Sequence, residues 1–149
     1  MADGMTLKIE GLQELEKKLL SMGPKLARNG LRASVGAGAR VIRDEAKARV
    51  PVDSGVMRRS IYIKQIRELS GNSQQTFFVG VRSGKKYRRK GQDAYYWRWV
   101  EFGYTAQNGR YIPAQSFMRQ AFEGRKVAAV DAIKSKLAER VEAYAKENT

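Results

Sequence analysis

The chain has 149 residues, about the length of one ordinary domain, and we expect residues 1–149 to fold as a single unit. It contains no cysteine, which excludes disulfides and thiolate chemistry, and no histidine, the commonest general base and transition-metal ligand. Lys and Arg number 29 against 15 Asp and Glu. The resulting net charge of +14 predicts attraction to nucleic acid, an anionic membrane or an acidic protein surface.

Neither a membrane span nor a signal peptide is predicted. No stretch approaches the roughly eighteen uncharged apolar residues needed to span a bilayer, and the first residues lack the apolar segment of a secretory signal. We therefore expect a soluble protein that is made in a cytoplasm and does not act in a membrane.

The N-terminal third predicts a short strand followed by two helices. Residues 5–10 alternate apolar and polar side chains, which is the period of a half-buried strand. From residue 12 the apolar spacing changes to three and four, typical of a short amphipathic helix that ends near Ser21. Proline suits the first turn of a helix, and we expect a second helix over residues 24–49, which Pro51 must end.

The middle of the chain predicts an antiparallel hairpin. Residues 60–66 and 76–81 are rich in β-branched and aromatic side chains, and a polar loop joins them. Residues 82–91 follow as an extended basic loop, and the aromatic segment 95–103 comes next. If that segment is a strand, alternation places Tyr96 with Arg98 on one face and Trp97 with Trp99 on the other, so that one face is buried.

The last third of the chain predicts one long helix of roughly thirty residues, with Ser116 as its N-cap. Its apolar side chains repeat at intervals of three and four and form one face: Val130, Ile133, Leu137, Val141 and Tyr144. The expected fold class is α+β, with N-terminal helices, a small antiparallel β-sheet and a long C-terminal helix.

The sequence predicts no catalytic residue, no cofactor and no metal site. Without His and Cys only Ser–Lys or carboxylate schemes remain, and no motif supports them. The carboxylates of Asp53, Asp93 and Glu101 are not spaced as in a known metal-binding loop. Gly36-Ala37-Gly38 lies inside a helical pattern, so close packing or a kink is favoured over a phosphate-binding loop.

The basic loop 82–91 is the sharpest electrostatic feature. Residues 51–110 hold twelve basic side chains against four acidic ones, and six of the twelve lie in this loop, which we expect to project as a mobile arm. It is either a polyanion or partner contact or a solubilising loop. If all six charges met phosphates, log affinity would fall with log salt at a slope near −5, about 0.9 per contact. The residues are Arg82, Lys85, Lys86, Arg88, Arg89 and Lys90.

The aromatic segment could stack on nucleic-acid bases, or it could fill a core and a subunit contact. The second reading is favoured, because aromatic side chains dominate the energetics of cores and interfaces. No helix-turn-helix, zinc-binding or ribonucleoprotein motif accompanies the charge, which disfavours sequence-specific nucleic-acid recognition.

Four short motifs in order resemble the phage tail-component family named after coliphage Hong Kong 97. Residues 46–61 (AKARVPVDSGVMRRSI) are similar to its "AK-x-x-VPVDTG-x-LR-x-SI" stretch, and Phe78-Val79-Gly80 matches its "V-x-VG" strand. Residues 95–103 (YYWRWVEFG) are similar to "YA-x-x-VEFGT", and residues 113–123 (PAQSFMRQAFE) to "PA-x-PF-L/M-RPA-x-E". Tyr104, Ser116, Gln120 and Ser54 depart from the family pattern.

The resemblance implies a structural virion protein, a tail-completion or neck subunit stacked between connector and tail tube. Its expected partners are itself, in a homo-oligomeric ring for which a hexamer is one candidate, the neighbouring connector, neck or tail-tube proteins, and DNA passing through the channel. The runner-up function is a non-specific nucleic-acid-binding protein. The expected subunit-interface residues are Tyr96, Trp97, Trp99, Phe102 and Phe117.

Six matched residues are expected to have structural roles: Pro51, Asp53, Gly55, Glu101, Gly103 and Pro113. We expect Asp53 to cap the turn after Pro51 and Gly55 to supply a backbone conformation that other residues resist. Glu101 lies in a basic neighbourhood and is expected to pair with an arginine, within or between subunits.

Overall fold

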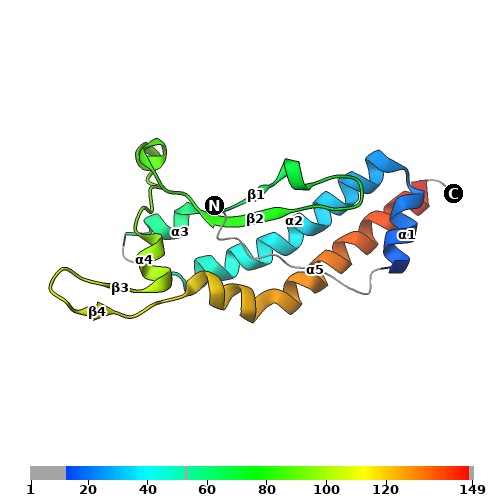
Figure 1. Ribbon diagram of the computed structural model, residues 1–149. Helices are drawn as coiled ribbons and strands as arrows, with labels where there is room; N and C mark the ends of the chain where they lie inside the picture. Colours follow the sequence, from blue (N-terminus) through cyan, green and yellow to red (C-terminus); the bar gives the residue numbers. More distant parts are fainter. Residues whose placement is uncertain (1–12, 53, 148–149) are drawn as a thin grey trace.

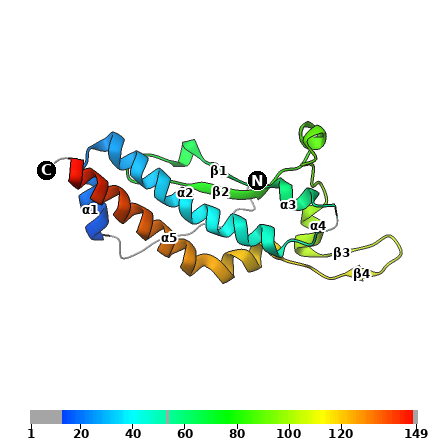
Figure 2. The ribbon, with the colours of Figure 1, turned by 180° about the vertical axis from the view of Figure 1, so that it is seen from behind.

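The computed structural model describes residues 13–52 and 54–147, and two long antiparallel helices form its frame (Figure 1). Helix α2 (Pro24–Arg49) and helix α5 (Phe117–Glu147) lie side by side along nearly their whole length, and both views show them running in opposite directions (Figures 1 and 2). Helix α1 (Gln13–Ser21) packs at the end where α2 begins and α5 ends. All three helices are confirmed close to the predicted bounds.

Small residues let α2 and α5 approach closely. Helix α2 is continuous through Gly36-Ala37-Gly38, and close packing at this run is confirmed by the approach of α5 to Gly38. A Cβ atom at Gly38 would lie 2.6 Å from Cγ1 of Ile133 on α5, nearer than real Cβ atoms come to other atoms. Ile133 belongs to the predicted apolar face of α5, and it is buried together with Leu137.

An antiparallel hairpin packs along α2, as predicted. Strand β1 (Ile61–Gln65) pairs with strand β2 (Phe77–Val81), with Ile61 opposite Val81 and Gln65 opposite Phe77. A 3₁₀ turn, η1 (Arg67–Leu69), lies in their connection. The sequence interpretation missed the short helix α3 (Val56–Ser60) that leads into β1, because five residues are too few for an apolar period to appear.

The remaining short elements gather at the end of the molecule opposite α1 (Figures 1 and 2). They are the 3₁₀ turn η2 (Lys85–Lys90), helix α4 (Trp97–Phe102), strand β3 (Tyr104–Thr105) and strand β4 (Tyr111–Ile112), the last two forming a second antiparallel pair. The prediction of an extended basic loop is therefore wrong, since most of it is helical. The strand interpretation of residues 95–103 is also wrong, because its centre is α4.

Two clusters of buried apolar side chains stabilise the fold. One joins α2, α3, β1, α4 and the start of α5, with Phe117 and Ile61 nearly fully buried, and the other holds α1 against α2 and α5 through Leu19 and Leu137. The α+β fold class is confirmed. The predicted strand over residues 5–10 lies outside the described residues. Among the helices of the described ranges, none has the length and apolar character to cross a membrane.

Candidate interaction surfaces at the α4 end

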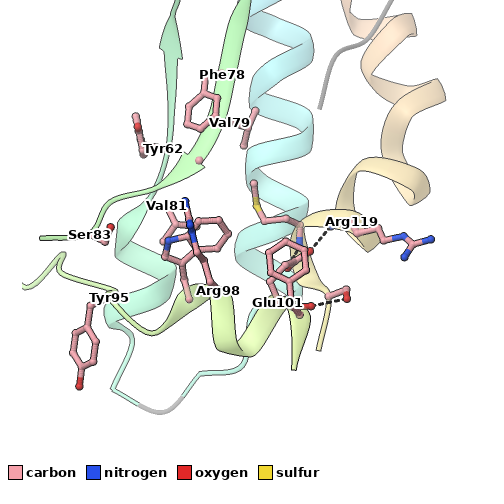
Figure 3. Close-up of a pocket in the computed structure, with 14 residues that line it drawn as sticks. Tyr62, Phe78, Val79, Val81, Ser83, Tyr95, Arg98, Glu101 and Arg119 are labelled. Atoms are coloured by element: carbon pink, nitrogen blue, oxygen red, sulfur yellow. Dashed lines mark hydrogen bonds between the residues drawn. The ribbon is translucent and has the colours of Figure 1, made fainter. Parts of the chain in front are cut away.

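The junction between α4 and α5 is organised by one buried carboxylate. Glu101, only 4% exposed, accepts hydrogen bonds from the backbone N–H groups of Met118 at 3.0 Å and Arg119 at 3.1 Å (Figure 3). These N–H groups lie in the first turn of α5 and have no partner within the helix. The carboxylate therefore caps α5 and places a negative charge at the positive end of the helix dipole.

The structure adds to one prediction about this junction and corrects another. Both Glu101 oxygens bond main-chain N–H groups and so cap the helix, and the expected pairing with an arginine, within or between subunits, stays a prediction. Ser116 does occupy the residue before α5, and its carbonyl accepts the first helical bond from the Gln120 N–H at 3.0 Å. Its hydroxyl, however, donates to the Glu101 carbonyl at 2.8 Å and does not cap the helix.

Gly103 ends α4 where only glycine fits. Its φ of +77° is a left-handed value, and a Cβ atom would lie 2.9 Å from the Ala114 nitrogen and from the Ile112 oxygen. Its N–H donates to the Trp99 carbonyl at 2.9 Å. This close approach of the backbone is the reason for the structural role expected of Gly103. Pro113 is exposed in the segment between β4 and α5.

The turn after α2 holds three of the residues expected to have structural roles: Pro51, Asp53 and Gly55. Pro51 follows the last residues of α2 and is exposed, and Gly55 has a φ of +79°, a left-handed value that residues with a side chain rarely adopt. The Gly55 carbonyl accepts a hydrogen bond from the Arg59 N–H at 3.1 Å and so begins α3. The capping role expected of Asp53 lies outside the described residues.

A groove of about 470 Å³ opens between the hairpin, α4 and the start of α5 (Figure 3). Tyr62 and Phe78 of the hairpin form one wall, with their rings in an edge contact at 6.1 Å. The Arg98 guanidinium lies 5.4 Å from the centre of the Trp97 ring, whereas the Arg119 guanidinium points away from the groove. The carboxylate among the lining residues, Glu101, is bonded to backbone N–H groups, which leaves a surface of aromatic and aliphatic side chains with the Arg98 cation.

Beside the groove lies an exposed aromatic surface, which we define as Tyr95, Trp99, Phe102, Tyr104 and Tyr111. Each of the five side chains is more than 40% exposed, although each is large and mostly apolar. Trp99 contacts two of the others, with its ring centre 6.4 Å from that of Tyr95 and 6.1 Å from that of Tyr104. Tyr95 and Phe102 line the groove as well.

The aromatic surface differs from the predicted interface set. Trp99 and Phe102 are exposed, as a subunit contact requires, but Phe117 is 2% exposed and lies in the core. Tyr96 and Trp97 pack partly buried against the same core. Tyr104 and Tyr111 were missed. Both lie on the β3–β4 hairpin, where Tyr104 pairs with Ile112 and Tyr111 with Thr105. Asn108-Gly109, a dipeptide typical of tight hairpin turns, is the signal from which that hairpin could have been predicted.

The basic loop carries its cations on η2. All five Lys and Arg side chains of Lys85–Lys90 are exposed. Arg82 precedes the turn, and its guanidinium lies 4.6 Å from the centre of the Tyr62 ring. Asp93 accepts a hydrogen bond from the Gly84 N–H at 2.7 Å and lies 3.6 Å from Arg88. Within the described residues no cluster of three or more Asp, Glu, His or Cys could hold a metal ion.

These features define a class: a small α+β protein that presents an aromatic surface and a basic turn at one end. The chain belongs to the HK97-gp10-like family, assigned as a tail component of bacteriophage HK97, whose family model matches residues 13–103. No curated protein and no solved structure matches the chain significantly. The family resemblance is confirmed, and the protein is a phage tail component with a structural role; residues 113–123 lie beyond the matched range.

Proposed function

We propose that the protein is a tail-completion or head-to-tail joining subunit that acts by assembly into a closed ring, with residues 1–149 as one assembly unit. The observation that carries this proposal is the aromatic surface. Soluble monomers rarely expose contiguous apolar patches of large side chains, and Tyr, Trp and Phe are enriched in the centres of protein interfaces. Trp99, which contacts two of the other rings, is the natural anchor of such a contact.

Closure of a ring requires a contact between two different faces of neighbouring copies. The aromatic surface of one copy meets another face of the next copy, and repetition of this contact closes a ring when the rotation between copies allows it. The groove receives side chains of the same neighbour, because Tyr95 and Phe102 belong to both the groove and the aromatic surface.

The proposed place of the ring is the head-to-tail joint of the virion, between connector and tail tube. The family's assignment as a tail component supports a position in the tail. The proposed partners are further copies of the chain and the adjacent neck, connector or tail-tube proteins. The proposed action needs no catalysis and no cofactor, because the work is done by surfaces that fit one another.

Sedimentation and native mass spectrometry of the purified chain test the proposal. We expect discrete oligomers whose formation is lost in the double variant Trp99→Ala/Phe102→Ala, since both side chains are exposed and leave the core intact. The matched control is Leu69→Ala, which removes another exposed apolar side chain from η1 and should assemble normally. A wild-type chain that stays monomeric, or phage heads and tails that join normally without the protein, would overturn the proposal.

The second candidate, a non-specific nucleic-acid-binding protein, is favoured by one observation, the five exposed cations of η2. A monomer that binds DNA tightly and does not assemble would support this candidate over the ring. Discrete oligomers or co-purification with tails would support the ring.

A further inference from the structure

The basic turn η2 is a folded element held in place from both ends. The Tyr87 N–H donates to the Gly84 carbonyl at 3.1 Å, and the Gly91 N–H donates to the Arg88 carbonyl at 3.1 Å. Below the turn the chain closes on itself, because the N–H of the fully buried Ala94 donates to the Arg82 carbonyl at 3.1 Å. The cations therefore stand on a rigid base, and the turn projects from the molecule in both views (Figures 1 and 2).

Asp93 is the side chain that fixes the start of the turn. Its carboxylate is 8% exposed, lies beside Arg88 and accepts the Gly84 N–H. Gly84, with a φ of +114°, is a backbone position that L side chains rarely adopt. On the other side, the Arg59 side chain of α3 donates to the Gly91 carbonyl at 3.3 Å. The acidic residue of this region is thus used to shape the turn.

The 3₁₀ geometry arranges the cations in two stacked pairs. With three residues per turn, side chains three positions apart lie above one another at a rise of about 6 Å. Lys85 with Arg88 and Lys86 with Arg89 form such pairs, and Lys90 follows at the end of the turn. Lys86 also lies over the Tyr87 ring at 4.9 Å, so the turn's aromatic side chain supports a cation.

The composition of the turn favours phosphates over an acidic protein surface. Protein interfaces are depleted of lysine and are anchored by buried aromatic or apolar side chains. The five cations of η2 have no exposed apolar side chain among them, since Tyr87 is partly buried. The apolar anchors of this end lie on the aromatic surface instead. Contacts to nucleic acid, in contrast, depend on Lys and Arg that meet phosphates.

We infer that η2 is a preorganised contact for the phosphate backbone of double-stranded DNA and that Asp93 is its positioning residue. The inference deepens the proposed function by naming the partner that the basic turn meets, and it rests on that function for the presence of DNA inside a ring. Recognition is independent of sequence, because a short 3₁₀ turn is neither the α-helix nor the two-stranded ribbon that the major groove admits, so its cations meet phosphates.

The first test measures the anisotropy of a short fluorescein-labelled duplex of mixed sequence at salt concentrations between about 0.05 and 0.2 M. The variant Lys85→Ala/Lys86→Ala/Arg89→Ala/Lys90→Ala keeps Arg88 for Asp93. We expect the slope of log affinity against log salt to become shallower by about 3 to 4, at about 0.9 per lost contact. The charge-matched control removes four exposed lysines from α1 and α5, and its slope should stay near that of the wild type: Lys17→Ala/Lys18→Ala/Lys126→Ala/Lys134→Ala.

The second test separates the geometry of the turn from its charge. Asp93→Asn and Asp93→Ala remove the same negative charge, but only asparagine keeps an oxygen that can accept the Gly84 N–H. We expect Asp93→Asn to bind DNA at least as tightly as the wild type and Asp93→Ala to bind about five-fold more weakly than Asp93→Asn, because a loosened turn must be ordered on binding. Equal binding by the two variants would remove Asp93 as a positioning residue.

The remaining outcomes decide the partner. Poly-L-glutamate is the probe for an acidic protein surface, and preferential loss of its binding in the four-cation variant, with DNA binding unchanged, would overturn the DNA assignment. Oligomers that form but show no turn-dependent DNA binding would sink this inference and leave the proposed ring standing. Turn-dependent DNA binding by a chain that never assembles would overturn the proposed ring and leave the DNA contact of η2 standing.

Discussion

Glu101 shows how a buried charge can serve the main chain. A carboxylate in a protein with 29 basic side chains is expected to find a cation. In the fold it accepts the two N–H groups that the start of α5 cannot satisfy internally. The partners are 17 and 18 residues away in the sequence, so no local pattern reveals them. Gly55 and Gly103 could be predicted more easily, since a left-handed turn restricts the choice to glycine at the position itself.

We expect Glu101→Ala to lower the free energy of unfolding by about 2–4 kcal/mol, since it leaves buried N–H groups without an acceptor and removes a charge from the helix terminus. Glu101→Gln keeps one acceptor oxygen and should cost about half as much. Urea denaturation followed by circular dichroism measures both. Glu123→Ala, at an exposed position on α5, the helix that Glu101 caps, is the control and should cost less than about 0.5 kcal/mol. Equal midpoints for Glu101→Ala and Glu123→Ala would contradict the capping role.

At the scale of elements, the long helices follow directly from the sequence and the short ones do not. Apolar spacing over 26 and 31 residues in α2 and α5 leaves little room for another interpretation. Helix α4 has six residues, and its aromatic side chains are ones that strands also favour. Its helical state depends on tertiary contacts: Trp97 packs on the core, and Gly103 ends the helix against Ala114.

The contact between α2 and α5 predicts opposite effects for two neighbouring glycines. Gly38→Ala places a Cβ atom against Ile133 and should lower the melting temperature, because overpacking costs about 1–3 kcal/mol. A Cβ atom at Gly36 would meet the Phe77 ring at 3.4 Å and the end of the Arg40 side chain at 3.9 Å, both ordinary contacts. The gain in helix propensity of up to about 1 kcal/mol should therefore leave the stability of Gly36→Ala unchanged or raised. Thermal unfolding followed by circular dichroism compares the two. A lower melting temperature for Gly36→Ala than for Gly38→Ala would show that the contact of Gly38 with Ile133 is not the tight packing contact of α2.

At the scale of the whole molecule, a net charge of +14 opposes the assembly that the aromatic surface favours. Copies brought together in a ring repel one another, and the repulsion is screened over about 10 Å at 0.1 M salt and about 3 Å at 1 M. Self-association, measured by sedimentation equilibrium, should therefore strengthen as sodium chloride is raised across this range. Association that weakens with salt would mean that ion pairs, and not aromatic contacts, hold the copies together.

The antiparallel pair of long helices also determines where a label can be attached. Helix α5 begins at the end that carries α4, the aromatic surface and η2, and its 31 residues extend for about 46 Å toward α1. An affinity tag or fluorophore fused behind α5 would stand a helix length away from every contact surface described here. Labels placed behind α5 are thus the ones suited to pulling assembled particles from a lysate, whereas an insertion at Asn108-Gly109 would disturb the aromatic surface.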